Sequence, residues 1–286
     1  MLRNTFLHIP GIGAITEKRL WDSGVTSWDA FVEPYPVRLS PNRIESLRRY
    51  LDESRIHFQN VNPNYFIELL PSNLQWRLFP EFRHSTAYLD IETTGMDGYY
   101  NDITMIGLYD GTSIYHYVKG QNLDDFRADI EKYKVIVTYN GKCFDLPFIR
   151  SNMGIAMNHT HIDLRYVLGS VGFSGGLKGC ETQAGIERGE LTGLDGYDAV
   201  LLWNDYKRNG SQKALETLLA YNSQDIVNLE VLMVLGYNLK LKDTPFWGTS
   251  QLRDPVVPEI PFKGDLETIE RIKIEKMNTF SGYGYW

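Results

Sequence analysis

Four carboxylates in three separate segments of this chain could do chemistry together. Asp90 and Glu92 lie in AYLDIETTG, Asp145 lies in NGKCFDLPF, and Asp225 follows Tyr221 in AYNSQDIVNL. Carboxylates gathered at one point repel each other, and such a cluster persists only if cations compensate it. Oxygen ligands of this kind suit Mg²⁺ and Mn²⁺. Two such ions about 3.5–4 Å apart can stabilise the attacking and leaving oxygens of a phosphodiester. We therefore expect a site for two divalent cations, Mg²⁺ or Mn²⁺.

The first acidic pair is expected on a strand at residues 85–93. Residues two apart on a strand share a face, so Asp90 and Glu92 should point the same way. The alternating apolar residues Ala87, Leu89 and Ile91 would then face a core. A solvent-facing acidic edge would show the same pattern, so this pair alone does not identify a site.

The last carboxylate is expected on a helix at residues 211–239, where apolar residues recur at helical spacing. Tyr221 and Asp225 are four residues apart and should share one face of this helix. A carboxylate beside a buried stripe is costly unless a positive group meets it. The alternatives are that Asp225 lies at the rim of the stripe and that Tyr221 is a core residue.

Asp145 follows the apolar strand 135–137 and the turn Asn140-Gly141. The carboxyl end of a strand is where sites usually form in an open sheet, so this loop could aim Asp145 at the other carboxylates. Because Asp145 also precedes Pro147, it would equally suit the N-cap of a helix.

In this order, the three motifs resemble those of the DEDD superfamily of 3′–5′ exonucleases, in the subtype with Tyr four residues before the last Asp. The likeness extends over about residues 65–240. It is to the proofreading domains of family B DNA polymerases and to stand-alone ribonuclease-H-like exonucleases of the YprB type. The resemblance implies that Asp90, Glu92, Asp145 and Asp225 bind metal. It also implies that Tyr221 orients or helps to activate the attacking water.

The same resemblance suggests further, tentative roles. Asp163 in His161-Ile162-Asp163-Leu164 could support the site as a carboxylate behind the metal ligands, or it could simply cap a helix. Glycine after the first motif would let backbone amides approach a terminal nucleotide closely. The candidate substrate-binding residues are Thr93, Thr94, Gly95, Asn140, Phe144 and Leu146.

The N-terminal segment IPGIGAITEKRLWDSGV resembles a helix-hairpin-helix element. Gly11 and Gly13 would expose backbone N–H groups, and a helix beginning near Ala14 would add its positive dipole. Together they could hold one phosphate without reading base sequence. The alternative is a small packing module with a core of Ile9, Ile12, Leu20, Trp21 and Val25.

The chain of 286 residues suggests one large or two ordinary domains. We expect an α/β fold, a ribonuclease-H-like mixed sheet flanked by helices, preceded by a small all-α helix-hairpin-helix module. The expected divisions are 1–60 for this module, 61–242 for the exonuclease domain, and 243–286 for a proline-rich strap, a helix and a tail. The strands are expected near 85–92, 103–109, 113–118, 134–139 and 161–163.

Composition restricts the class of protein further. The formal net charge of −7 argues mildly against broad binding to duplex nucleic acid. Two cysteines, Cys143 and Cys180, do not suggest a disulfide framework, which favours a reducing interior. No secretory segment or long apolar run is evident, so we expect a cytoplasmic protein without a membrane partner.

The expected function is metal-dependent 3′–5′ exonuclease activity on single-stranded ends, releasing nucleoside monophosphates. The polarity comes from the resemblance, and DNA is favoured over RNA because hairpin modules are commoner on DNA-processing proteins. The expected partner is thus single-stranded DNA or RNA with a 3′ end. The alternatives are an exoribonuclease, a structure-selective endonuclease and a catalytically inactive nucleic-acid-binding module. The aromatic tail at 281–286 could stack on bases or be a packed or frayed terminus.

Overall fold

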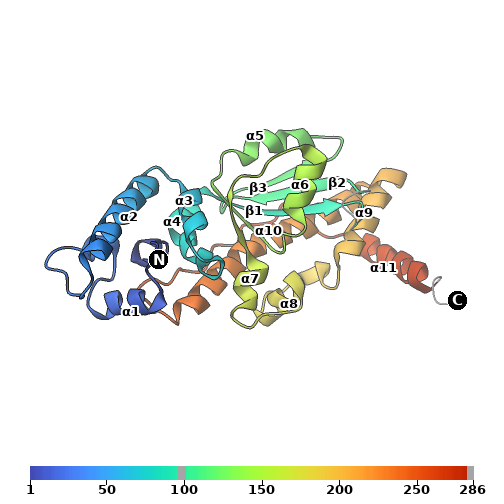
Figure 1. The fold of residues 1–286 in the computed structure, drawn as a ribbon. Helices are drawn as coiled ribbons and strands as arrows, with labels where there is room; N and C mark the ends of the chain where they lie inside the picture. The colour runs from blue at the N-terminus through green and yellow to red at the C-terminus, as the bar shows by residue number, and fades with distance from the viewer. Residues whose placement is uncertain (96–100, 282–286) are drawn as a thin grey trace.

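A five-stranded mixed sheet lies at the centre of the structure, a computed structural model that describes residues 1–95 and 101–281 (Figure 1). The strand order is β3-β2-β1-β4-β5. The strands are β1 (Thr86–Thr93), β2 (Ile103–Tyr109), β3 (Ile114–Val118), β4 (Val135–Thr138) and β5 (Thr160–Asp163). Each lies where the sequence pattern predicted a strand, so the expected mixed α/β sheet is confirmed.

Both pairing directions occur in this sheet. β1 is antiparallel to β2, and β2 is antiparallel to β3. On the other side, β1 is parallel to β4, and β4 is parallel to β5. The carboxyl ends of β1, β4 and β5 therefore meet at one edge, which is where functional loops gather in sheets of this kind.

Helices cover the two faces of the sheet (Figure 1). On one face, α5 (Phe126–Ile130) and α6 (Asp145–Met153) pack on the apolar residues Leu89 and Ile91 of β1. On the other face lies the long helix α10 (Gln212–Leu241), which matches the helix expected at 211–239. Since α10 is buried over most of its length, charged groups on its sheet-facing side need partners.

Shorter helices lie around these layers (Figure 1). They are the 3-10 helix η5 (Leu123–Asp125), α7 (Leu164–Gly169), α8 (Gly176–Gln183), the 3-10 helix η6 (Gly189–Leu191) and α9 (Gly196–Asn209). A capping box of Asp195 and Asp198 begins α9, and Gly210, in the left-handed conformation, ends it. This sharp ending sends the chain back into α10.

The N-terminal part is helical, as expected. It contains η1 (Leu2–Asn4), α1 (Ala14–Asp22), η2 (Trp28–Ala30), α2 (Pro41–Gln59), α3 (Pro63–Leu69), η3 (Ser72–Leu78), α4 (Phe79–Phe82) and η4 (Arg83–Ser85), the η elements being 3-10 helices. Only the three-residue η1 precedes the glycine turn, so a full first helix of the expected hairpin element is not seen. The apolar side chains of this part join the same buried cluster as β4 and α10.

After α10, the proline-rich residues 251–265 form no helix or strand. They lead to α11 (Leu266–Ser281), which lies beside α9 at the end of the molecule opposite α1 and α2 (Figure 1). The aromatic tail at 282–286 lies outside the described residues. Among the helices described, none has both the length and the apolar character needed to cross a membrane.

Candidate active site

Three of the expected carboxylates converge between β1 and α10. One oxygen from each of Asp90, Glu92 and Asp225 can be chosen so that all three atoms lie within 4.8 Å of one another. The alternation of β1 accounts for the first two, because Leu89 and Ile91 point into the core beneath α5 and α6. Asp225 reaches them from the facing helix, 133 residues after Glu92 in the chain.

Asp145 lies beside this group rather than within it. It is the first residue of α6, and its Oδ1 accepts a hydrogen bond of 3.1 Å from the backbone N–H of Ile91. The N-cap position of α6 is Phe144, and Asp145 therefore does not cap the helix. Its carboxylate is instead tied to the strand that carries Asp90 and Glu92.

Burial and mutual repulsion make this cluster hard to ionise. Burial raises the pKa of Asp90 well above its ordinary value, and the charges of Glu92, Asp225 and Asp145 raise it further. Burial, followed by the charge of Asp225, raises the pKa of Glu92 to about 8. Burial also raises the pKa of Asp145 to about 7. Divalent cations would relieve the repulsion that these shifts record.

Tyr221 lies one helical turn before Asp225 and is only 4% exposed. The ammonium of Lys178 on α8 lies 4.4 Å from the centre of its ring, within the range of a cation–π contact. Burial, and then the charge of Asp225, raise the pKa of the Tyr221 hydroxyl above its ordinary value. The phenol therefore keeps its proton at neutral pH.

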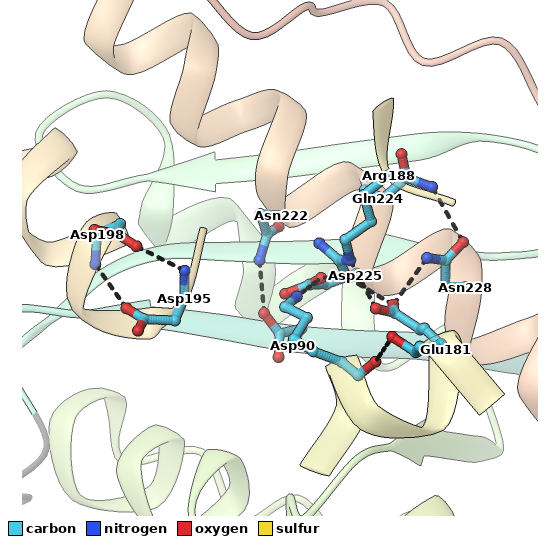
Figure 2. Close-up of polar contacts among 11 residues, drawn as sticks. Asp90, Glu181, Arg188, Asp195, Asp198, Asn222, Gln224, Asp225 and Asn228 are labelled. Carbon is cyan, nitrogen blue, oxygen red and sulfur yellow. Dashed lines mark hydrogen bonds and ion pairs between the residues drawn. The ribbon is translucent and has the colours of Figure 1, made fainter. Parts of the chain in front are cut away.

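Two cations that sequence reasoning did not assign hold Asp225. Lys178 and Arg188 both donate to its Oδ1. Arg188 also binds Glu181 through two bonds of 2.6 Å, from Nε to Oε2 and from Nη2 to Oε1 (Figure 2). Asn228 on α10 donates to the same Glu181 carboxylate at 2.8 Å. The result is a buried polar network that links α8 and the following loop to α10.

Asn222, next to Tyr221, is a further residue that sequence reasoning missed. Its Nδ2 donates to Oδ2 of Asp90 at 2.9 Å (Figure 2). Gly107 on β2, the cross-strand partner of Asp90, makes room for it. A Cβ atom at position 107 would lie 1.8 Å from Oδ1 of Asn222.

Sequence signals for these residues existed but were weak. Lys178 and Glu181 are three residues apart on α8, so they share a helix face. Asp225 on a buried helix required a positive partner, and Lys178 and Arg188 were available in the segment before it. Nothing in the spacing showed which cation would reach it.

Three of the candidate substrate-binding residues, Thr93, Thr94 and Leu146, make contacts within the fold. Thr93 donates from Oγ1 to the carbonyl of Gly95 at 2.5 Å, and the backbone N–H of Thr94 donates to the carbonyl of Asp102 at 2.9 Å. Leu146 is buried in the core cluster of α5 and α6. These contacts belong to the fold itself.

The loop residues before α6 are also engaged. Asn140 has a φ of 64° and accepts a bond of 2.6 Å from Arg165 through Oδ1. Phe144 is half-buried, with its ring centre 4.7 Å from that of Phe148. Asp163 caps α7 through the N–H of Arg165 and also accepts the N–H groups of Asn140 and Lys142, at 2.8 and 3.1 Å. It therefore both caps a helix and tethers the loop that leads to Asp145.

The two hairpin glycines lie on the surface. Gly11 has a φ of 80°, and Gly13 is the N-cap of α1. Around both, a Cβ atom would meet nothing within 4 Å. Ile9, Ile12, Leu20 and Val25, the apolar residues of this segment, are buried, as the alternative packing role requires.

Comparison with known proteins supports this architecture. Residues 87–237 match the model of the RNase H superfamily, over a range that contains β1 through most of α10. Among solved structures, the chain resembles a family B DNA polymerase from the hyperthermophilic archaeon Pyrobaculum calidifontis, with 17% identity and a TM-score of 0.40. This match covers 55% of the chain and 24% of the polymerase, so the chain spans only a part of that protein. No curated protein matches the chain. Because the family match extends over more than half of its residues, this chain belongs to the RNase H superfamily.

Proposed function

We propose that the protein is a metal-dependent 3′–5′ exonuclease that acts on single-stranded ends, preferentially of DNA. The observation that carries this proposal is the convergence of Asp90, Glu92 and Asp225 within 4.8 Å, with Asp145 beside them. Membership of the RNase H superfamily supports phosphodiester hydrolysis as the class of reaction. The polarity rests on the resemblance of the three motifs to those of the DEDD 3′–5′ exonucleases.

The four carboxylates fit a pair of divalent cations. The donors are oxygens only, which suits Mg²⁺ and Mn²⁺. Burial raises the pKa of Asp90, Glu92 and Asp145, and the charges of neighbouring carboxylates raise that of Asp90 and Glu92 further. Asp90, Glu92, Asp145 and Asp225 would hold the ions, which when bound stabilise charge on the attacking and leaving oxygens.

The other residues prepare the reacting groups. Tyr221 remains protonated and offers its hydroxyl as a hydrogen-bond donor that orients a water molecule or a phosphate oxygen. Asn222 fixes the orientation of Asp90, and Lys178, one-third exposed beside Asp225, attracts the phosphate. The water oxygen bonds to phosphorus while the bond to the 3′ oxygen of the preceding nucleotide breaks. That oxygen takes up a proton, which leaves a shortened strand with a 3′ hydroxyl and a nucleoside 5′-monophosphate.

End-labelled oligonucleotides test the polarity and the chemistry together. With Mn²⁺, a 5′-labelled single strand should give a ladder of progressively shorter products, whereas a 3′-labelled strand should release its label at once as a mononucleotide. EDTA should stop both reactions. An RNA strand of the same sequence reports the preference between polymers.

Other products would contradict the proposal. Immediate release of the 5′ label would reverse the polarity, and internal fragments alone would indicate an endonuclease. Binding without hydrolysis under every metal condition would indicate an inactive nucleic-acid-binding module.

A further inference from the structure

A second cavity, of about 330 Å³, lies at the junction between the N-terminal helices and the sheet. Its lining comes from η3, the loop before α6, β5, α7 and the last turn of α10. None of the four carboxylates proposed to bind metal lines it, and neither does Tyr221. A space of this size at such a junction is typical of sites that bind small molecules.

The cavity carries positive charge. Lys142 and Lys240 both line it, and within residues 1–95 and 101–281 neither ammonium forms an ion pair. Lys240 donates to the Ser170 hydroxyl at 2.7 Å, and burial lowers its pKa. The one carboxylate in the lining, Asp163, is already used by three backbone N–H groups. An anion would therefore find two cations that form no direct ion pair, although the charge of Asp243 also acts on Lys240.

Aromatic rings lie beside both ammonium groups. The Tyr166 side chain is 55% exposed, and the Lys142 ammonium lies 5.8 Å from the centre of its ring. The Lys240 ammonium lies 5.8 Å from the ring of Trp76, whose buried indole N–H has no partner in the described part of the chain. Cations interleaved with aromatic faces are typical of surfaces that bind the phosphates and bases of single strands.

The cavity is also close to the catalytic loop. Lys142 lies three residues before Asp145, so their Cα atoms are at most about 11 Å apart. Asp163 binds the backbone N–H of Lys142 and so fixes the root of this side chain. A nucleic-acid strand whose 3′ end lies at the carboxylates could therefore place one of its nucleotides in the cavity.

We propose that this cavity binds a nucleotide, with its phosphate at Lys142 and Lys240 and its base against Tyr166. The proposal rests on the proposed nuclease function for the identity of the ligand. The nucleotide has two possible sources that share this chemistry. It is either an internal nucleotide of the substrate strand or a free nucleoside monophosphate of the kind that hydrolysis releases.

Binding measurements on the full-length protein test the cavity without relying on hydrolysis. In EDTA, the Kd of a labelled eight-nucleotide single strand is measured by fluorescence anisotropy, and the Kd of a nucleoside monophosphate is measured by calorimetry. The proteins are wild type, Lys142→Ala with Lys240→Ala, Tyr166→Ala, and the control Lys207→Ala, an exposed lysine on α9. We expect the Lys142→Ala, Lys240→Ala double variant to bind at least one of these two ligands about tenfold more weakly. The control should match wild type.

The ligand whose affinity falls in the variants identifies which nucleotide occupies the cavity. Weaker strand binding with no measurable monophosphate binding indicates an internal nucleotide, and weaker monophosphate binding indicates the free one. Each lysine that meets a strand phosphate should lower the slope of log K against log salt by about 0.7. Equal Kd values for both ligands in wild type, the double variant and Tyr166→Ala would overturn the proposal.

An alternative pair of variants and a hydrolysis assay separate failure of the cavity proposal from failure of the nuclease function. Lys142 and Tyr166 are exposed, so the pair Lys142→Ala and Tyr166→Ala carries the test if the Lys240 variant does not fold. If wild type hydrolyses no strand but the variants still lose affinity, the nuclease function fails and the cavity proposal stands. If hydrolysis occurs and all affinities are equal, the cavity proposal fails alone.

Discussion

At the scale of the residue, the site is built from carboxylates that the fold forces together against their charge. Glu92 shows this most clearly, because burial and the nearby Asp225 raise its pKa to about 8. Asp90 and Asp145 are shifted in the same direction. The metal-free protein therefore holds protons on this cluster that the unfolded chain would release.

This difference gives the stability of the metal-free protein a pH dependence with a defined sign. Between the ordinary pKa of Glu, about 4.3, and the folded value, the folded state binds more protons than the unfolded state. The contribution of Glu92 to the free energy of unfolding should therefore fall as the pH rises from about 5 to 8. We expect Glu92→Gln to reduce this slope, because the amide cannot ionise.

Thermal unfolding in EDTA across this pH range measures the effect, since each kcal/mol changes Tm by about 2–4 °C in a protein of roughly this size. Glu216→Gln, at an exposed position of α10, is the matched control and should keep the wild-type slope. The charge assignment is wrong if Glu92→Gln also keeps it.

At the scale of the element, the site depends on how closely β2 and α8 approach α10. β1 and α10 were predictable because the alternation and the helical spacing of their apolar residues are local properties of the sequence. The partners of Asp225 could not be predicted in this way, because Lys178 and Arg188 reach it only after α8 and its loop have packed. The place of Asn222 against Gly107 likewise depends on tertiary contact.

Gly107→Ala should disturb the site through this contact. The added Cβ would lie 1.8 Å from Oδ1 of Asn222, and so the amide that holds Asp90 must move. We expect lower stability, by about 1–3 kcal/mol as in other overpacked cores, together with reduced nuclease turnover. Urea unfolding and a hydrolysis assay measure the two effects.

Gly196→Ala is the control, since a Cβ there meets nothing within 4 Å and alanine favours a helix. Adding Asn222→Ala to Gly107→Ala should restore stability but not turnover, because Asp90 then lacks its donor. Wild-type stability and turnover in Gly107→Ala alone would show that Asn222 does not need this space.

Arg188 and Lys178 bind the same oxygen but should differ in their contribution to stability. The Arg188 side chain is 7% exposed, whereas the Lys178 side chain is 33% exposed. Removing Arg188 would also leave the buried Glu181 carboxylate without its cation. Breaking a buried pair costs about 3–5 kcal/mol, whereas partly exposed pairs contribute about 0–1 kcal/mol. Urea unfolding should therefore show a much larger loss for Arg188→Gln than for Lys178→Gln. Equal losses would contradict the expectation that burial decides how much each cation contributes.

At the scale of the whole molecule, the N-terminal helices and the RNase H-like part share one core. The Trp28 ring stacks on Phe66 with centres 5.8 Å apart, and Glu17 forms a buried ion pair of 3.0 Å with Arg77. These contacts cross the expected division at residue 60. Sequence reasoning anticipated the helices themselves, but it could not weigh packing across this division against phosphate binding, because both use the same segment.

A single glycine substitution separates these two roles. Removing residues 1–60 would leave Arg77 buried without Glu17, and Gly11→Val would be strained at a φ of 80°. Gly13, by contrast, has extended backbone and open space around it, so Gly13→Val should leave stability within about 0.5 kcal/mol of wild type.

If the hairpin holds one phosphate, Gly13→Val should weaken single-strand binding and lower the salt slope by about 0.7. The measurement is the oligonucleotide Kd of both proteins at two salt concentrations. Identical affinities and slopes would leave the segment with a packing role alone.

The most direct test of the account is the Mn²⁺-dependent hydrolysis of a 5′-labelled single strand by Asp90→Asn. This change keeps the shape of the side chain and removes a carboxyl group that is costly to ionise there, so the metal-free fold should be at least as stable as wild type. We expect hydrolysis to fall to the level of wild type in EDTA, while Asp124→Asn, an exposed acid on η5, keeps the wild-type rate. Hydrolysis by Asp90→Asn at the wild-type rate would contradict the claim that these carboxylates form a nuclease site.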